Sequence, residues 1–330
     1  MEYILNEKND KKITLKKFQN ELLSMMKDID KICVKNNIKY ILYGSSVLGA
    51  VCYKGFRSCD DNISIAMTRD NYYKLIKVLE HNSEYTAQSY ELDKRYLVTG
   101  PAMKIRKLNT YVEEKNIFLK NKCSDCDGIF INVFIISNIS RSKLIDFIVR
   151  YLNAFIALVI ITFEFVEINP ILLKRLYKWN SKMYDKLNKK SNYIGEDITN
   201  FRSILKLNSY KYNDIFPSVK KKFCNTKFPI PHNSEKYLLK YFGYNYMENL
   251  SKNKKNFIHI KNVDLNITTE QQIKYIEAKK LKKLLKQIIL FGLCLIIFST
   301  MLLAEFSFLL AGIGIMILGV ALMILFNTKN

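Results

Sequence analysis

The sequence is poor in the residues and motifs that mark several common enzyme classes. It has three histidines in 330 residues, and they stand far apart at positions 81, 232 and 259. A Ser-His-Asp triad is therefore not indicated. The chain also has neither a Walker A motif nor a G-x-G-x-x-G motif. These absences argue against a P-loop nucleotide-binding protein and a dinucleotide-binding protein.

Acidic residues are also scarce, and the N-terminus has no apolar run. The chain has 52 Lys and Arg against 30 Asp and Glu, a formal net charge of +22. No compact basic helix with interleaved aromatic residues is present, so nucleic acid is not the expected partner. The excess charge favours anionic lipid headgroups or phosphate-bearing substrates, or it reflects solvated lysine-rich faces. The polar N-terminus and the odd number of cysteines, seven, indicate reduced thiols in a domain that faces the cytosol.

The N-terminal part predicts a helix, a turn and two strands. Apolar residues spaced by three and four predict an amphipathic helix over 13–36, followed by a buried strand over 38–43. Gly44-Ser45-Ser46 follows that strand directly, and a helix is expected to continue over 47–51. A glycine turn that opens a helix is either an ordinary turn or a phosphate cradle. A second strand is predicted over 63–67, which places positions 62 and 64 on one face. A helix is expected to follow over 69–80, with Tyr72, Leu75, Ile76 and Leu79 as its buried stripe.

Two later strands carry polar residues that need an explanation. In Met103–Arg106, the alternation puts Lys104 and Arg106 on one face, either in solvent or aimed at substrate phosphates. In the apolar strand 129–136, Asn132 is the one polar residue, and a buried polar residue needs a partner or a purpose. Cys123 and Cys126 form a C-x-x-C pair. A zinc site needs about two more ligands, which are not evident, so unlinked thiols are the alternative.

The C-terminal half predicts further helices and a membrane hairpin. The apolar run 152–163 is too short to span a bilayer and is expected to form a buried or interfacial helix. Residues 170–190 are basic and helical in pattern, and 191–232 are loop-rich. A helix is expected over 234–242, closed by Gly243. Residues 249–268 resemble a linker.

Two apolar runs, 288–304 and 306–326, predict the hairpin itself. Between Lys286 and Lys329 the single charged residue is Glu305, which marks the expected turn. A buried hairpin in a soluble core is the alternative. The lysines at 279–286 and Lys329 favour the cytoplasmic side. The chain is thus expected to be an integral membrane protein with its soluble domain on the cytoplasmic side.

Several motifs, taken in order, resemble the LicD family, which includes phosphocholine transferases and fukutin-type proteins. The resemblance covers roughly residues 18–250 and leaves out the apolar C-terminus. It rests on the N-terminal helix and strand, the glycine turn, an Asp-rich run, a K-x-R strand, a third polar strand and C-terminal aromatic landmarks. These are Asp28–Cys33 with Asn36-Asn37-Ile38, Gly44–Val51 with Lys54-Gly55-Phe56, Asp60–Ile65, Lys104-Ile105-Arg106 with Asn109-Thr110, Gly128–Phe134, Phe216-Pro217, Pro229-Ile230-Pro231, Tyr237-Leu238, Tyr241-Phe242-Gly243 and Tyr246-Met247.

The resemblance implies a nucleotidyltransferase-like α/β core that transfers a phospho-substituent, such as phosphocholine, from a cytidine diphosphate donor to a cell-surface or lipid-linked glycan. In such a site strand carboxylates hold Mg²⁺, and the glycine turn with Lys104 and Arg106 would hold phosphates. Here the family's three carboxylate positions are Asn62, Ser64 and Asn132. Asp60 and Asp61 remain as surrogate ligands if the strand shifts its register.

Two functions follow from these observations. The first is a membrane-attached LicD-like transferase that uses Mg²⁺. The second is a catalytically degenerate protein that binds a nucleotide, a glycan or a protein partner. The predicted fold is an α/β (α+β) core with a helical C-terminal part and a transmembrane hairpin. Its expected parts are 1–140 for the core, 141–248 for the helical and loop-rich part, 249–286 for a basic linker and helix, and 287–327 for the hairpin.

Overall fold

A computed structural model describes the chain in six segments, and the chain divides into two compact units. The described residues are 4–8, 11–115, 126–165, 168–200, 208–244 and 259–301, together with the single residues 313, 315 and 317. The first unit comprises residues 1–161 and 170–267, and the second comprises 162–169 and 268–330. Every strand of the described part belongs to the first unit.

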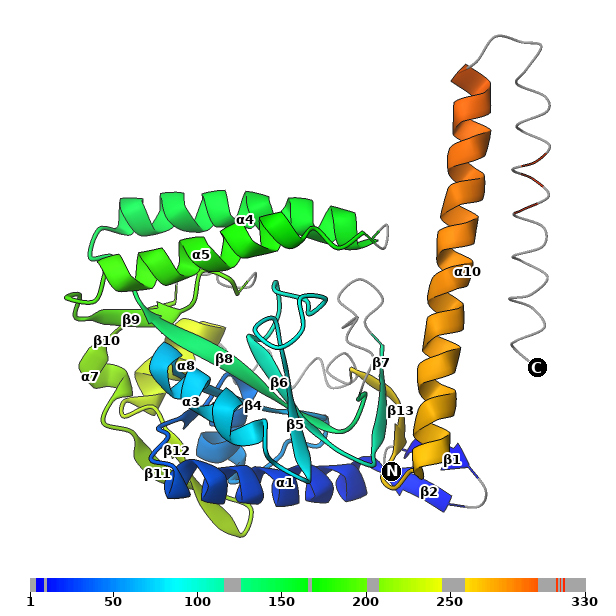
Figure 1. Cartoon of the computed structure of the whole chain (residues 1–330). Helices are drawn as coiled ribbons and strands as arrows, with labels where there is room; N and C mark the ends of the chain where they lie inside the picture. Colours follow the sequence, from blue (N-terminus) through cyan, green and yellow to red (C-terminus); the bar gives the residue numbers. More distant parts are fainter. Residues whose placement is uncertain are drawn as a thin grey trace. The chain divides into compact units, whose positions relative to one another are not determined.

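A mixed sheet of seven strands forms the centre of the first unit (Figure 1). Its central strand, β8 (Phe130–Asn138), pairs parallel with β4 (Ile63–Thr68). Along its other edge, the first half of β8 pairs antiparallel with β6 and the second half with β9. The sheet is therefore mixed α/β in class, as predicted. Its other members are β3 (Ile41–Leu42), β5 (Tyr85–Ser89), β6 (Met103–Lys107), β9 (Tyr193–Glu196) and β10 (Ser209–Lys211).

The predicted N-terminal helix is confirmed as α1 (Leu15–Lys35). The Thr14 hydroxyl caps it by accepting a hydrogen bond from the Lys17 N–H at 3.3 Å. The apolar stripe of α1 is buried, which explains why the segment forms a helix rather than a strand. Its buried apolar members are Leu15, Phe18, Leu22, Leu23, Met25, Met26, Ile29 and Cys33.

The glycine turn and the helices that flank β4 also follow the predicted order. β3 leads into Gly44, and a short helical segment follows, formed by α2 (Ser45–Leu48) and the π-helical turn η1 (Gly49–Tyr53). After β4 comes α3 (Arg69–Leu79), whose predicted stripe of Tyr72, Leu75, Ile76 and Leu79 is buried. Near the end of the first unit, α8 (Ser234–Phe242) is closed by Gly243 as predicted.

Several short strands lie where loops or a linker were expected. The loop-rich region contains β9, β10, α7 (Tyr212–Ile215) and the hairpin of β11 (Val219–Phe223) with β12 (Thr226–Ile230). In the expected linker, β13 (Ile260–Asp264) pairs antiparallel with β7 (Tyr111–Glu114). Near the N-terminus β1 (Ile4–Lys8) pairs with β2 (Lys11–Thr14). These strands are too short for a periodic sequence signal, and they depend on partners that are distant in sequence.

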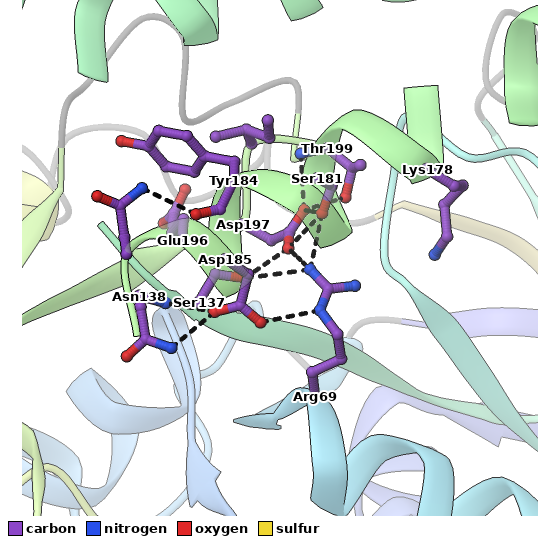
Figure 2. Close-up of polar contacts among 12 residues, drawn as sticks. Arg69, Ser137, Asn138, Lys178, Ser181, Tyr184, Asp185, Glu196, Asp197 and Thr199 are labelled. Carbon is purple, nitrogen blue, oxygen red and sulfur yellow. Dashed lines mark hydrogen bonds and ion pairs between the residues drawn. The ribbon is translucent and has the colours of Figure 1, made fainter. Parts of the chain in front are cut away.

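A buried polar cluster fastens α5 (Ile171–Leu187) to the sheet and to the start of α3 (Figure 2). Arg69 is ion-paired with Asp197 and, at 3.0 Å, with Asp185. Asp197 also accepts hydrogen bonds from Ser137 at 2.5 Å and from Ser181 at 2.7 Å. Burial would raise the pKa of Asp197, but Arg69 and these donors hold it well below its usual range. The members of the cluster come from α3, β8, α5 and the segment after β9, so the cluster joins these four parts of the fold.

The structure changes the prediction for the apolar run 152–163, and it leaves the C-terminal hairpin as a prediction. The run 152–163 was expected to be too short to cross a bilayer, but it lies within α4 (Lys143–Phe165), a helix of 23 residues. Within the described residues, α4 is long and apolar enough to cross a membrane by length and composition. In the second unit, α10 (Thr269–Met301) joins the lysine-rich segment to the first C-terminal run. Nearly all of the second run lies outside the described residues, so the hairpin remains a prediction.

Candidate functional site

The strand register brings three of the predicted site residues into one row across the sheet. On the parallel pair β4–β8, Ser64 is the partner of Asn132. On the antiparallel pair β6–β8, Lys104 is the partner of the same Asn132. Partners in register have side chains on the same face. Ser64 and Lys104 are each 8% exposed, and the side-chain oxygen of Asn132 is buried without a hydrogen-bond partner. We call Ser64, Asn132 and Lys104 the polar row.

The glycine turn lies next to this row because its groups bond to β4 and α8. The Ser46 hydroxyl accepts a hydrogen bond from the Ser64 N–H at 3.0 Å. The Gly44 N–H donates to the Tyr237 hydroxyl at 2.9 Å. Gly44 has φ of +56°, and a Cβ there would lie 2.9 Å from the Tyr241 hydroxyl oxygen. Only glycine suits this conformation and this close approach. Two of the turn's polar groups thus hold the turn in place, and the half-buried Ser45 is the third predicted residue there.

Two cations of β6 share one counter-ion, Glu114, which no sequence pattern indicated. Glu114 of β7 accepts from the Lys104 amine at 2.6 Å and from the Arg106 guanidinium at 2.9 Å. Both cations also lie over the ring of Phe130, at 4.1 Å and 4.7 Å from its centroid. Arg106 also donates to Gln88 at 3.0 Å. Lys104 and Arg106 therefore share one side of β6, as predicted, and both are buried rather than in solvent.

The charges of these three residues depend on one another. Burial lowers the pKa of Lys104 to about 8, against the opposing effect of Glu114. Burial alone would raise the pKa of Glu114, but Lys104 and Arg106 lower it to about 2. At neutral pH Glu114 is ionised and forms ion pairs with both cations. A phosphate that approached this face would have to compete with Glu114 for them.

The two remaining aspartates of the Asp-rich run are engaged elsewhere. Asp60 forms a buried ion pair with Arg57 at 2.6 Å. Asp61 accepts hydrogen bonds from the backbone N–H groups of His259 and Ile260, the latter at 3.0 Å, and from the His259 ring. These bonds tie the start of β13 to the loop before β4. Neither aspartate therefore serves as a surrogate ligand in this structure.

The residues present do not fit a divalent metal ion. Of the three predicted ligand positions, Ser64 and Asn132 lie side by side but are neutral, and Asn62 donates its amide to Asp61 at 3.2 Å. The residues that the structure describes contain no group of three or more His, Cys, Asp or Glu side chains that could hold a metal. Mg²⁺ prefers charged oxygen ligands in octahedral geometry. No step of a reaction is therefore assigned to a metal ion at this site.

Of the C-x-x-C pair, only Cys126 lies among the described residues. Cys126 is buried, and its sulfur lies 3.8 Å from the Lys107 carbonyl oxygen. Cys123 lies outside the described residues, so the zinc alternative remains a prediction.

The first unit is thus a mixed α/β domain with a cation-lined polar row across three neighbouring strands. Among curated proteins, the chain is similar to the lipopolysaccharide cholinephosphotransferase LicD of Haemophilus influenzae, with 31% identity over 106 residues. The match covers 32% of this chain and 40% of that relative, so the chain spans about two fifths of the curated relative it matches. No family model matches the chain, and no solved structure matches it. The similarity supports a LicD-like relationship.

Proposed function

We propose that this chain has a phosphocholine transferase-like function on a nucleotidyltransferase-like core. The observation that carries the proposal is its similarity to a cholinephosphotransferase. The polar row and the glycine turn are where a cytidine diphosphate donor would bind. Its phosphates would compete with Glu114 for Lys104 and Arg106, and Asn132 offers an unpartnered oxygen. The acceptor would be a cell-surface or lipid-linked glycan.

A second function, binding of such a nucleotide or glycan without catalysis, is favoured by one observation. The row has a hydroxyl and an amide where strand carboxylates would hold metal ions, while Asp60 and Asp61 are bonded to other groups. Without that charge, a resident divalent cation would be weakly held. Binding would then rest on the cations of β6 and on the polar row.

A titration of the full-length protein in detergent micelles separates the two functions. Binding of cytidine diphosphocholine is followed by calorimetry, with and without Mg²⁺, and transfer by release of CMP with lipopolysaccharide as acceptor. Release of CMP that depends on Mg²⁺ would rule out the non-catalytic form. Binding that is indifferent to Mg²⁺, with no CMP released, would rule out the transferase. An absence of binding would contradict both.

A pair of variants tests whether the polar row is the binding site. Asn132→Leu removes the unpartnered oxygen and fills the row, so it should weaken donor binding by about tenfold, the cost of one hydrogen bond that this oxygen would accept from a hydroxyl or amine of the donor. Asn266→Leu makes the same change at an exposed position and should leave the affinity unaltered. Equal affinities for both variants would place the donor elsewhere.

We further propose that residues 287–327 attach the protein to a membrane as a hairpin, with the first unit on the cytoplasmic side. Support comes from the two uncharged runs, which are separated only by Glu305, and from the lysines that precede them. The lysine-rich segment and the start of the first run are continuous within α10.

A further inference from the structure

The helix α4 buries polar side chains and exposes apolar ones, which is the inverse of an ordinary surface helix. Its polar side chains Asp146, Arg150 and Asn153 are between 1% and 4% exposed. Arg150 binds Asp146 at 2.9 Å and the Glu196 carbonyl at 3.0 Å, and Asn153 donates to the Ile198 carbonyl at 2.9 Å. The outward side is apolar and between 46% and 68% exposed. It comprises Leu144, Ile145, Phe147, Ile148, Tyr151, Leu152 and Phe155.

The neighbouring helix α5 repeats this inversion. Its buried side chains include Lys174, whose amine donates to the Tyr96 carbonyl at 3.0 Å, and Lys178, which pairs with Glu91 at 3.1 Å. Its outward side carries Ile171, Leu172, Leu176, Trp179 and Leu187, which are between 42% and 77% exposed. The Tyr184 hydroxyl of α5 donates to Asp146 of α4 at 2.6 Å, which joins the two helices (Figure 1). We call their outward side the α4–α5 face.

The charges around this face are of one sign. Lys143, Arg175, Lys182 and Lys186 are exposed on the two helices. The carboxylates in residues 143–161 and in α5 are Asp146 and Asp185, and both bond to groups of the protein. The face therefore combines large apolar side chains, cations and Trp179, which is the single tryptophan of the chain. This is the composition of a helix that lies in a membrane interface.

Two other arrangements fit the observations less well. If α4 crossed the bilayer, Asp146, Arg150 and Asn153 would lose their partners and enter the hydrocarbon, which is costly. If a second copy covered the face, each copy would bring exposed cations against those of the other, in a chain of net charge +22. A surface of anionic lipid satisfies both the apolar side chains and the cations.

We propose that the α4–α5 face docks into the headgroup and upper acyl region of a bilayer that contains anionic lipid. The helices lie in the plane of the interface, their polar sides hold the sheet, and their apolar sides enter the lipid. This contact is separate from the C-terminal apolar runs and does not depend on the proposed transferase function.

The single tryptophan makes the proposal directly testable in the full-length protein. The protein is reconstituted in phosphatidylcholine vesicles with phosphatidylserine, with or without bromine at carbons 6 and 7 of the acyl chains. Bromine quenches only on close contact. Docking predicts that Trp179 emission falls about twofold or more in brominated vesicles and that acrylamide in the water quenches it poorly. Full quenching by acrylamide with no effect of bromine would overturn the proposal. Shielding from both quenchers would also overturn it, because protein would then cover the face.

Matched variants separate docking of this face from attachment by the C-terminus. Phe155→Glu places a charge on the α4 part of the face, at a side chain that is 65% exposed, and should abolish most of the bromine quenching of Trp179. Val34→Glu makes a similar change on α1, at a side chain that is 67% exposed, and should leave the quenching unchanged. Circular dichroism confirms that both fold. Equal quenching in both variants would contradict docking through this face.

Discussion

At the scale of single residues, the candidate site has neutral side chains at two positions where the resemblance to the LicD family predicts metal-binding carboxylates. Ser64 and Asn132 lie in register on neighbouring parallel strands, where two carboxylates would converge. Two unit charges about 4 Å apart interact by about 4 kcal/mol at an effective dielectric near 20. Replacing carboxylates with a hydroxyl and an amide therefore removes most of the attraction for a divalent cation, while the strands that would present the ligands remain.

Restoring the carboxylates should create a metal site. We expect the triple variant Asn62→Asp, Ser64→Asp, Asn132→Asp to bind Mg²⁺ with a dissociation constant in the millimolar range or below, about 4 kcal/mol of affinity, measured by calorimetry. The control adds three aspartates at exposed positions, Asn36→Asp, Ser142→Asp and Asn266→Asp. Equal heats for the two proteins would mean that the pocket has lost more than its carboxylates.

Glu114 should matter more for stability than its neighbour in sequence. Glu114→Gln leaves Lys104 and Arg106, which are 8% and 1% exposed, without their counter-ion. We expect a loss of about 3 kcal/mol in the free energy of unfolding, measured with urea at pH 7. Glu113→Gln is the control, because its partner Lys261 is exposed and lies 3.5 Å away. That change should cost less than about 1 kcal/mol.

The pH dependence of this difference follows from the lowered pKa of Glu114. Its folded-state pKa of about 2 lies below the ordinary value of 4.5. Its contribution to stability is therefore complete above about pH 4.5 and is lost as the pH falls toward 2. The difference between the parent and Glu114→Gln should shrink over this range. A constant difference would show that the pKa of Glu114 is not lowered in the folded protein.

At the scale of elements, α5 is held by charge rather than by apolar packing alone. Arg69 is ion-paired with both Asp185 and Asp197 in the cluster of Figure 2, and the side chains of the pair Arg69–Asp197 are 11% and 3% exposed. Removing the cation would break the ion pair of a buried carboxylate, which is costly. The connection between α3, β8 and α5 therefore depends on this guanidinium.

We expect Arg69→Met to lower the free energy of unfolding by about 3 to 5 kcal/mol and to speed hydrogen exchange of the α5 amides. The control is Arg95→Met, which breaks an ion pair with Asp93 whose arginine is 47% exposed. That variant should change stability by less than about 1 kcal/mol. Unchanged exchange in α5 for Arg69→Met would contradict the role assigned to the cluster.

At the scale of the whole molecule, the proposed membrane contacts rest on the charge, the α4–α5 face and the apolar C-terminus. A net charge of +22 would favour anionic lipid, and the outward sides of α4 and α5 would provide an apolar contact in the first unit. The C-terminal runs provide a second apolar segment. A transferase or binding protein for lipid-linked glycans would benefit from being held at the bilayer in this way.

The hairpin predicts that both ends of the chain lie on the same side of the membrane. Tags at the N-terminus and the C-terminus should both be digested by protease added to inverted, cytoplasm-out vesicles, while a tag inserted at Glu305 should be protected. Digestion of only one terminal tag would contradict the hairpin. Protection of both would contradict the cytoplasmic orientation.

The sequence alone determined the elements with a strong local period. The stripe of α1, the buried side of α3, the strand β4 and the glycine that closes α8 all follow from spacing and backbone preference, which act within a few residues. The position of Lys104 and Arg106 on the same face of β6 followed from the alternation of side chains along a strand. The sequence did not indicate the partners of Asp60 and Asp61.

Only the tertiary structure decided which polar groups meet. Glu114 reaches Lys104 from another strand, and Asp61 binds backbone groups almost two hundred residues away. No local pattern encodes such contacts, because they depend on how β7 and β13 pair. The inversion of α4 was likewise hidden. Its apolar residues predicted a buried or interfacial helix. Its polar side is buried because it bonds to Tyr184 of α5 and to the Glu196 carbonyl at the end of β9, and its apolar side faces outward.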